Sequence, residues 1–157
     1  MPVPGFPQPS RERGPLVELD RERVKTALLV TAYGGFLVAQ HATKRMLEYG
    51  GGAIFFTGAS ASVKGYSGSA PFAMGKFALR GLPQSMAREL QPKNIHVAHF
   101  VIDGGVANEA RGLTNSENDP DKWLEPEAIV QTYMAILDQP RSAWSWEVEL
   151  RPWVETF

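Results

Sequence analysis

The chain has 157 residues, a formal net charge of -1 at pH 7 and 43% hydrophobic residues, which is typical of one globular domain. The balanced charge leaves no basic stripe for phosphates or anionic lipids, so we expect neither a nucleic-acid nor a membrane partner. Because the chain has no cysteine, it has neither disulfide bonds nor a thiolate site, and we expect a cytoplasmic protein.

The N-terminal segment is rich in proline and contains no long apolar run. We therefore expect residues 1–13 to form an extended leader and residues 14–157 to form one domain. A helix is expected over residues 20–49, because Asp20 can accept hydrogen bonds from the first amides of a helix and glycines follow the helix at 50–52.

The middle of the chain predicts a strand, a helix and a second strand. Residues 53–58 begin with an apolar run on both faces, which is typical of a parallel strand covered on two sides. A loop rich in serine and glycine follows, then a helix over 71–90 and an apolar strand over 95–102. A right-handed crossover makes two such strands parallel, and ligands bind at the carboxyl ends of strands in these sheets.

Two more elements are expected near the C-terminus. A short helix over 126–138 begins with a proline, and a strand over 146–150 alternates apolar and charged residues. We expect an edge strand with Glu147 and Glu149 in water. The predicted fold class is α/β, a partial Rossmann-like (doubly wound) parallel sheet of about three strands with flanking helices.

Other chemistries are poorly supported by the spacing of the polar residues. His96 and His99 would point to opposite faces of a strand and His41 lies on a distant helix, so no metal site is expected. The serine-rich loop contains no G-x-S-x-G motif, which disfavours a hydrolase.

One stretch is more specific, namely GAIFFTGASASVKGYSGSAPFAMGKFALRGLPQSMAREL over residues 52–90, followed by NIHVAHFVIDGGV over 94–106. It resembles the second half of the short-chain dehydrogenase/reductase family, in which a strand ends in a catalytic serine and the next helix carries Tyr-x-x-x-Lys. The ending WEVELRPWVETF resembles one branch of this family that has phenylalanine in place of the tyrosine.

The resemblance implies roles for particular residues. Lys76 stands at the family lysine, which stabilises the tyrosine phenolate and holds the cofactor ribose; the alternative is a surface lysine on an amphipathic helix. Phe72 stands at the tyrosine and has no ionisable proton. After the next strand, Gly104 and Val106 stand where relatives contact the nicotinamide.

The resemblance matches the remaining members of the family tetrad less well. The family serine falls on Ala59, with Ser60 as the next hydroxyl and Ser62 after it, and which hydroxyl faces a substrate stays open. The family asparagine matches Thr31. The catalytic candidates are therefore Lys76, Ser60 and the Phe72 position.

The resemblance implies an NAD(P)-dependent oxidoreductase. Family members bind the cofactor pyrophosphate at a glycine-rich turn after the first strand, and no G-x-x-x-G-x-G follows a predicted strand here. We therefore expect that the N-terminal nucleotide-binding half is missing and that the chain is truncated, and weakly active or inactive alone. The alternative is a non-enzymatic assembly module derived from this family, a homo-oligomer formed through helices 20–49 and 71–90.

Overall fold

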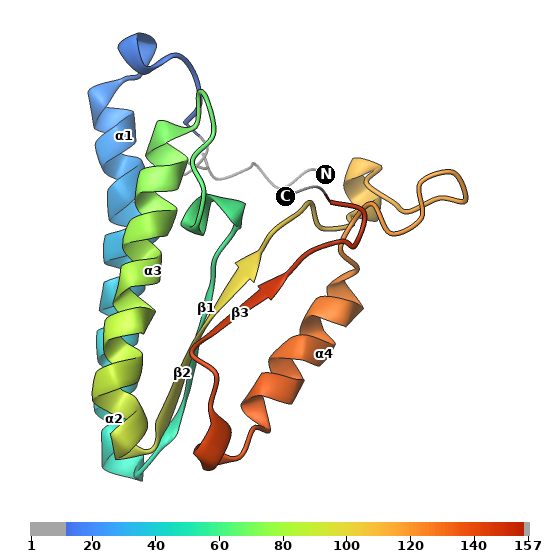
Figure 1. Ribbon diagram of the computed structural model, residues 1–157. Helices are drawn as coiled ribbons and strands as arrows, with labels where there is room; N and C mark the ends of the chain where they lie inside the picture. Colours follow the sequence, from blue (N-terminus) through green and yellow to red (C-terminus); the bar gives the residue numbers. More distant parts are fainter. Residues whose placement is uncertain (1–11, 156–157) are drawn as a thin grey trace.

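The centre of the molecule is a three-stranded parallel sheet (Figure 1). The structure is a computed structural model that describes residues 12–155. The strands are β1 (Gly52–Thr57), β2 (Ile95–Ile102) and β3 (Glu147–Leu150), in the order β1-β2-β3. Gly52 lies opposite Ile95, and His99 lies opposite Glu147. The predicted α/β class with about three parallel strands is confirmed.

The helices before β1 form one continuous run. It consists of α1 (Arg21–Leu28), a π-type turn (Leu29–Tyr33) and α2 (Gly34–Tyr49). The run begins where the Asp20 carboxylate accepts a hydrogen bond from the backbone N–H of Arg23 (2.8 Å), and it ends at Gly50, which has a φ of 82°. The helix expected over residues 20–49 is confirmed, but its interior π turn was not predicted. The leader expected over residues 1–13 lies almost entirely outside the described residues.

Helices cover both faces of the sheet. With α1, helices α2 and α3 (Ala70–Leu90) lie on one face, and α4 (Pro126–Leu137) lies on the other (Figure 1). Because successive residues of β2 point to opposite faces, Ile95 and Val97 pack beneath α2 and α3, whereas Phe100 and Ile102 pack beneath α4. No helix among the described residues combines the length and apolar character needed to cross a membrane.

Helices α2 and α3 approach each other closely at Gly35. A Cβ atom at Gly35 would lie 2.6 Å from Leu79 Cδ1, whereas a Cβ atom at Gly34 would meet only the Leu29 carbonyl oxygen at 3.5 Å. The buried Leu79 side chain therefore occupies the space that a larger residue at position 35 would fill. Packing within one chain is sufficient to explain this glycine.

The outer edge of β1 is open. Within residues 12–155, β1 pairs with β2 alone, and its Ile54 and Phe55 are only half-buried. A groove of about 360 Å³ runs along this edge beside α2. Its lining comes from the π turn, α2, β1 and α3: Val30, Thr31, Gly34, Gly35, Val38, Ala39, Ala42, Ile54, Phe55, Phe56, Thr57 and Leu79.

A buried carboxylate joins the segments that follow the three strands. Asp103, directly after β2, forms ion pairs with Arg151 after β3 and with Lys64 after β1 (2.9 Å to Nζ), and it accepts a hydrogen bond from Ser60. Burial by itself would raise the pKa of Asp103, but these donors lower it to about 2. The paired charge therefore holds the carboxyl edge of the sheet together.

Replacing Asp103 by Asn should destabilise the fold and flatten its acid dependence. The pKa of Asp103 is about 2 in the folded chain, compared with an ordinary value of 3.8. Its ionisation therefore stabilises the fold fully at pH values above 3.8, and this contribution is lost as the pH falls towards 2. We expect a loss of about 2 kcal/mol in the free energy of unfolding at pH 7. Urea unfolding at a series of pH values, followed by circular dichroism, measures both effects.

The matched control is Asp119→Asn, which changes an exposed carboxylate paired with Lys122. We expect this variant to keep the wild-type acid dependence, since exposed pairs contribute little. If Asp103→Asn and Asp119→Asn show the same acid dependence, the stabilising role of Asp103 is contradicted.

Candidate functional site

The carboxyl end of β1 holds the lysine predicted from the sequence. Lys76, in the second turn of α3, donates a hydrogen bond from Nζ to the backbone carbonyl oxygen of Thr57, the last residue of β1 (3.1 Å). Burial lowers the pKa of the Lys76 ammonium. The ammonium is thus turned towards the sheet, at the strand end where parallel sheets bind ligands.

Phe72 lies one turn before Lys76 on α3. Lys76 Nζ is 5.9 Å from the centroid of the Phe72 ring, within the range of a cation–π contact. The ring offers its negative face to the ammonium, but it carries no proton. The Phe72 ring can therefore stabilise the Lys76 ammonium, but no proton can be transferred from the Phe72 position.

Both candidate serine hydroxyls form hydrogen bonds in the turn after β1. Ser62 is fully buried, and its Oγ accepts a hydrogen bond from the backbone N–H of Ala59 (3.1 Å). Ser60 donates its hydroxyl to the Asp103 carboxylate. In this structure each hydroxyl therefore holds the turn in place.

Thr31 lies in the π turn, against α3. A Cβ atom at Gly75 would lie 3.2 Å from Thr31 Cβ, so Thr31 packs against α3 at Gly75. Turns of π type interrupt the regular helical hydrogen bonds and often occur at functional sites. The structure thus places Thr31, the residue matched to the family asparagine, against α3 at Gly75.

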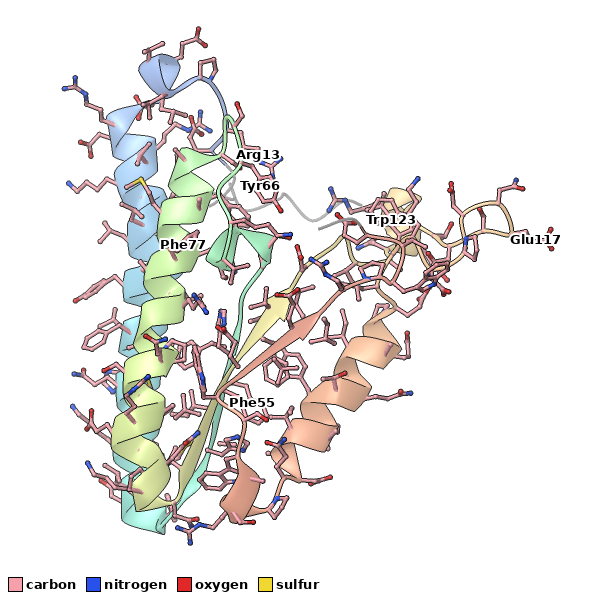
Figure 2. The ribbon with its side chains drawn as sticks, viewed as in Figure 1. Arg13, Phe55, Tyr66, Phe77, Glu117 and Trp123 are labelled. Carbon is pink, nitrogen blue, oxygen red and sulfur yellow. The ribbon has the colours of Figure 1, made fainter. Side chains whose placement is uncertain are left out.

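Gly104 and Val106 lie at the same edge of the sheet, after β2. A Cβ atom at Gly104 would lie 2.7 Å from Pro152 Cδ, so Gly104 packs against the C-terminal segment. Val106 is 38% exposed and bridges to Leu124. Figure 2 shows Tyr66 on the loop after β1 and Trp123 on the segment after β2, the two segments that flank this edge.

A charged network beneath α3 was not foreseen. Both carboxylate oxygens of Glu147 accept hydrogen bonds from Arg80 (2.6 Å each), and Glu147 Oε2 also lies 2.9 Å from His99 Nδ1. The expectation that Glu147 faces water is therefore wrong. Its face of β3 is partly covered by α3, and an alternating pattern does not distinguish a solvated charge from a paired one beneath a helix.

The two strand histidines point to opposite faces, as predicted. His96 stacks on Trp144 with ring centroids 4.6 Å apart, whereas His99 lies beneath α3. The described residues include no group of three or more His, Cys, Asp or Glu side chains that could hold a metal ion.

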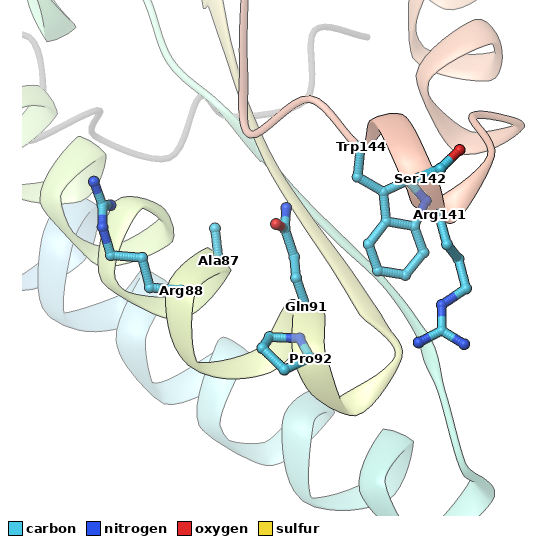
Figure 3. A pocket seen from close by; sticks show the side chains of 7 residues that line it. All are labelled: Ala87, Arg88, Gln91, Pro92, Arg141, Ser142 and Trp144. Atoms are coloured by element: carbon cyan, nitrogen blue, oxygen red, sulfur yellow. The ribbon is translucent and has the colours of Figure 1, made fainter.

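A second hollow lies at the opposite end of the sheet. It has a volume of about 580 Å³ and is lined by the end of α3 and the segment before β3 (Figure 3). The lining residues are Ala87, Arg88, Gln91, Pro92, Arg141, Ser142 and Trp144. All of them precede β2 or β3 in the chain, so this hollow lies at the amino ends of these strands, away from Lys76.

The sequence matches a family of known enzymes over most of its length. The family model described as enoyl-(acyl carrier protein) reductase matches residues 5–138. Carbonyl reductase family member 4 of Danio rerio is 28% identical over 132 residues, which cover 80% of this chain and 54% of that protein. Short chain aldehyde dehydrogenase 1 of Euphorbia lathyris is 27% identical over 122 residues, which cover 78% of this chain and 41% of that protein. The chain thus spans about half the length of these curated relatives.

Solved structures share the fold. A short-chain dehydrogenase from Rhodopseudomonas palustris is 39% identical, with a TM-score of 0.73, and the match covers 90% of this chain and 57% of that one. Serine dehydrogenase complexed with NADP+ has a TM-score of 0.76 at 16% identity, and the match covers 92% of this chain and 62% of that one. The matched family model, the relatives and the motif around Lys76 agree, and the chain belongs to the short-chain dehydrogenase/reductase family.

Proposed function

We propose that the chain carries the nicotinamide-facing half of an NAD(P)-dependent oxidoreductase. The observation that supports this most directly is the hydrogen bond from Lys76 Nζ to the Thr57 carbonyl oxygen. It holds a lysine of lowered pKa at the carboxyl end of a parallel strand, where such sheets bind cofactors. Residues 58–69 and 107–122 flank this edge and would form the substrate side.

The described residues fit one end of a nicotinamide dinucleotide. Lys76 has three N–H donors, of which one bonds Thr57, so two remain for the hydroxyls of a ribose. Gly104 and Val106 would border the nicotinamide, which supplies the hydride when bound. Residues 12–155 include no binding site of the usual kind for the cofactor pyrophosphate, which is a helix that begins directly at the end of a strand. Residues 58–69 separate β1 from α3, for example.

We further propose that the chain is weakly active or inactive by itself. The groove beside β1 is open and includes Thr57, whose carbonyl oxygen accepts the Lys76 hydrogen bond. A strand from a nucleotide-binding half that pairs with this edge would cover the groove and complete the cofactor site. The matches cover only 54% and 41% of these two curated relatives, which leaves room for such a half.

Lys76→Ala tests the cofactor site. The test mixes this chain with a fragment of the Rhodopseudomonas palustris short-chain dehydrogenase, namely the part of that enzyme that does not align with this chain. We expect NADH or NADPH to bind to the mixture and to bind much more weakly to this chain alone. Loss of the ribose hydrogen bonds should weaken binding to the mixture at least tenfold in Lys76→Ala, since bonds to a charged group contribute about 1.5–3 kcal/mol. Isothermal titration calorimetry measures the affinity.

The control for this test is Lys93→Ala, which removes a lysine paired with Glu89 at the far end of α3. Equal affinity in the Lys76→Ala and Lys93→Ala mixtures would remove Lys76 from the cofactor site. A well-formed complex that binds neither cofactor would refute the oxidoreductase proposal.

Phe72→Tyr tests the chemistry. The new phenol would lie beside the Lys76 ammonium, whose charge favours the phenolate. General acid catalysis typically contributes about 10²–10⁴-fold, so we expect carbonyl reduction by the assembled protein to rise by roughly 100-fold. The loss of NADPH absorbance measures the rate. Phe77→Tyr, five residues further along α3 at a position that is 45% exposed (Figure 2), is the control and should show no gain.

A second candidate function is assembly into a homo-oligomer through α2 and α3. A groove of about 370 Å³ lies between these helices. It is lined by apolar and polar side chains: Phe36, Ala39, Gln40, Thr43, Lys44, Leu82, Ser85, Met86, Glu89 and Leu90. Phe36 is 40% exposed at this groove, which is consistent with a surface that another copy covers.

Phe36→Glu tests this second candidate. If copies of the chain pair through the groove, a buried unpaired carboxylate at position 36 should convert the oligomer to a monomer. Light scattering of the purified chain measures the mass. Val130→Glu, on the exposed face of α4, is the control and should leave the mass unchanged. A wild-type chain that is already monomeric would contradict the assembly function.

A further inference from the structure

Thr57, the last residue of β1, is bonded to helices on both faces of the sheet. Its backbone carbonyl oxygen accepts a hydrogen bond from Lys76 Nζ on α3 (3.1 Å). Its side-chain Oγ1 forms a hydrogen bond with the hydroxyl oxygen of Tyr133 on α4 (2.8 Å). Since α3 covers one face of the sheet and α4 covers the other (Figure 1), Thr57 connects α4 to the candidate lysine.

The direction of the Thr57 carbonyl is not set by pairing with β2. On that side the N–H of Gly58 donates to the carbonyl oxygen of Phe100 (2.7 Å). The peptide bond between Thr57 and Gly58 is trans, so the Thr57 carbonyl points away from that N–H, towards the open edge of β1. Lys76 Nζ is the donor that reaches the carbonyl there. The geometry of this bond therefore depends on what else holds Thr57.

The Tyr133 side chain is itself held in place by aromatic contacts. Its ring stacks on Phe100, with ring centroids 3.7 Å apart and an interplanar angle of 13°, and it forms a T-shaped contact with Phe55 at 6.2 Å. Burial raises the pKa of Tyr133, so its hydroxyl keeps its proton at neutral pH and remains able to donate or accept. A hydroxyl that is fixed in this way anchors the Thr57 side chain from the α4 side of the sheet.

We propose that Tyr133 is a positioning residue for Lys76. Its hydroxyl holds the Thr57 side chain, and this bond fixes the direction of the Thr57 carbonyl that accepts the Lys76 ammonium. Tyr133 thus acts on Lys76 through Thr57. The inference rests on the proposed function only where it concerns the cofactor, because the effect on the ammonium is measurable in the chain alone.

Hydrogen exchange of the Lys76 ammonium with water is the first test, measured by nitrogen NMR without any cofactor. In the wild-type chain we expect this exchange to be slower at Lys76 than at the exposed Lys25. Tyr133→Phe keeps the stacked ring and removes only the hydroxyl. It should make exchange at Lys76 about fivefold faster, as expected for the loss of one hydrogen bond.

Variants of Thr57 test the same bond from its other partner. Thr57→Val keeps the branched shape of the side chain without its hydroxyl, and it should speed exchange at Lys76 as much as Tyr133→Phe does. The double variant should be no faster than either single variant, because both changes remove one bond. Thr57→Ser retains the hydroxyl and should keep the slow exchange. Equal rates in Thr57→Val and Thr57→Ser would overturn the proposal.

Tyr49→Phe is the matched control, because it removes the hydroxyl of a tyrosine that is 84% exposed at the end of α2. It should leave exchange at Lys76 unchanged. The proposal is contradicted if a folded Tyr133→Phe chain behaves like this control, or if wild-type Lys76 exchanges as fast as Lys25. The wild-type comparison and Thr57→Val decide the question even if Tyr133→Phe fails to fold.

Cofactor affinity is the second test, in the mixture used for Lys76→Ala. Tyr133→Phe should weaken NADPH binding about threefold, as for the partial loss of a hydrogen bond, and it should have no effect in the Lys76→Ala background. A purely structural role would weaken binding equally in both backgrounds and would overturn the proposal. A mixture that binds no cofactor counts against the proposed function alone, and the exchange rates then decide the role of Tyr133.

Discussion

The complete burial of β2 determines where the other elements lie. All eight of its residues are buried, so both faces of this strand require a covering layer and both edges require a paired strand. Helices α2 and α3 provide one layer and α4 the other, while β1 and β3 occupy the edges. Since all three strands run in the same direction, their carboxyl ends meet at one edge, where Lys76, Gly104 and Val106 lie.

Two carboxylates hold this arrangement together, the buried Asp103 at the end of the sheet and the partly buried Glu147 beneath α3. Asp103 joins the segments after all three strands, and Glu147 joins β3 to α3 and to β2 through Arg80 and His99. A buried charge without partners would destabilise the fold, so each carboxylate fixes the geometry of the cations around it. Both clusters border the turn that follows β1, which makes this turn one of the most constrained parts of the candidate site.

Sequence reasoning recovers the elements whose pattern depends on local chemistry. The Asp20 cap, the helix to Gly50 and the apolar strand from Ile95 follow from capping and periodicity, and the four-residue spacing of Phe72 and Lys76 places both on one side of α3. The π turn and the ion pair of Glu147 were missed for a physical reason. Each depends on packing against an element distant in sequence: Thr31 against Gly75, and Glu147 against Arg80.

The structure separates the groups that hold the candidate site from the groups that would perform chemistry in it. Lys76 is placed by its burial and by its bond to the Thr57 carbonyl oxygen, neither of which requires a tyrosine at position 72. The turn is held by Ser62 and by the Ser60 bond to Asp103, neither of which requires a hydroxyl at Ala59. Under the proposed match of Phe72 to the family tyrosine, a phenylalanine there lacks a proton donor but removes no support of the scaffold. In the proposed function, such a chain would keep the lysine that holds a cofactor ribose while it lacks the proton donor at position 72.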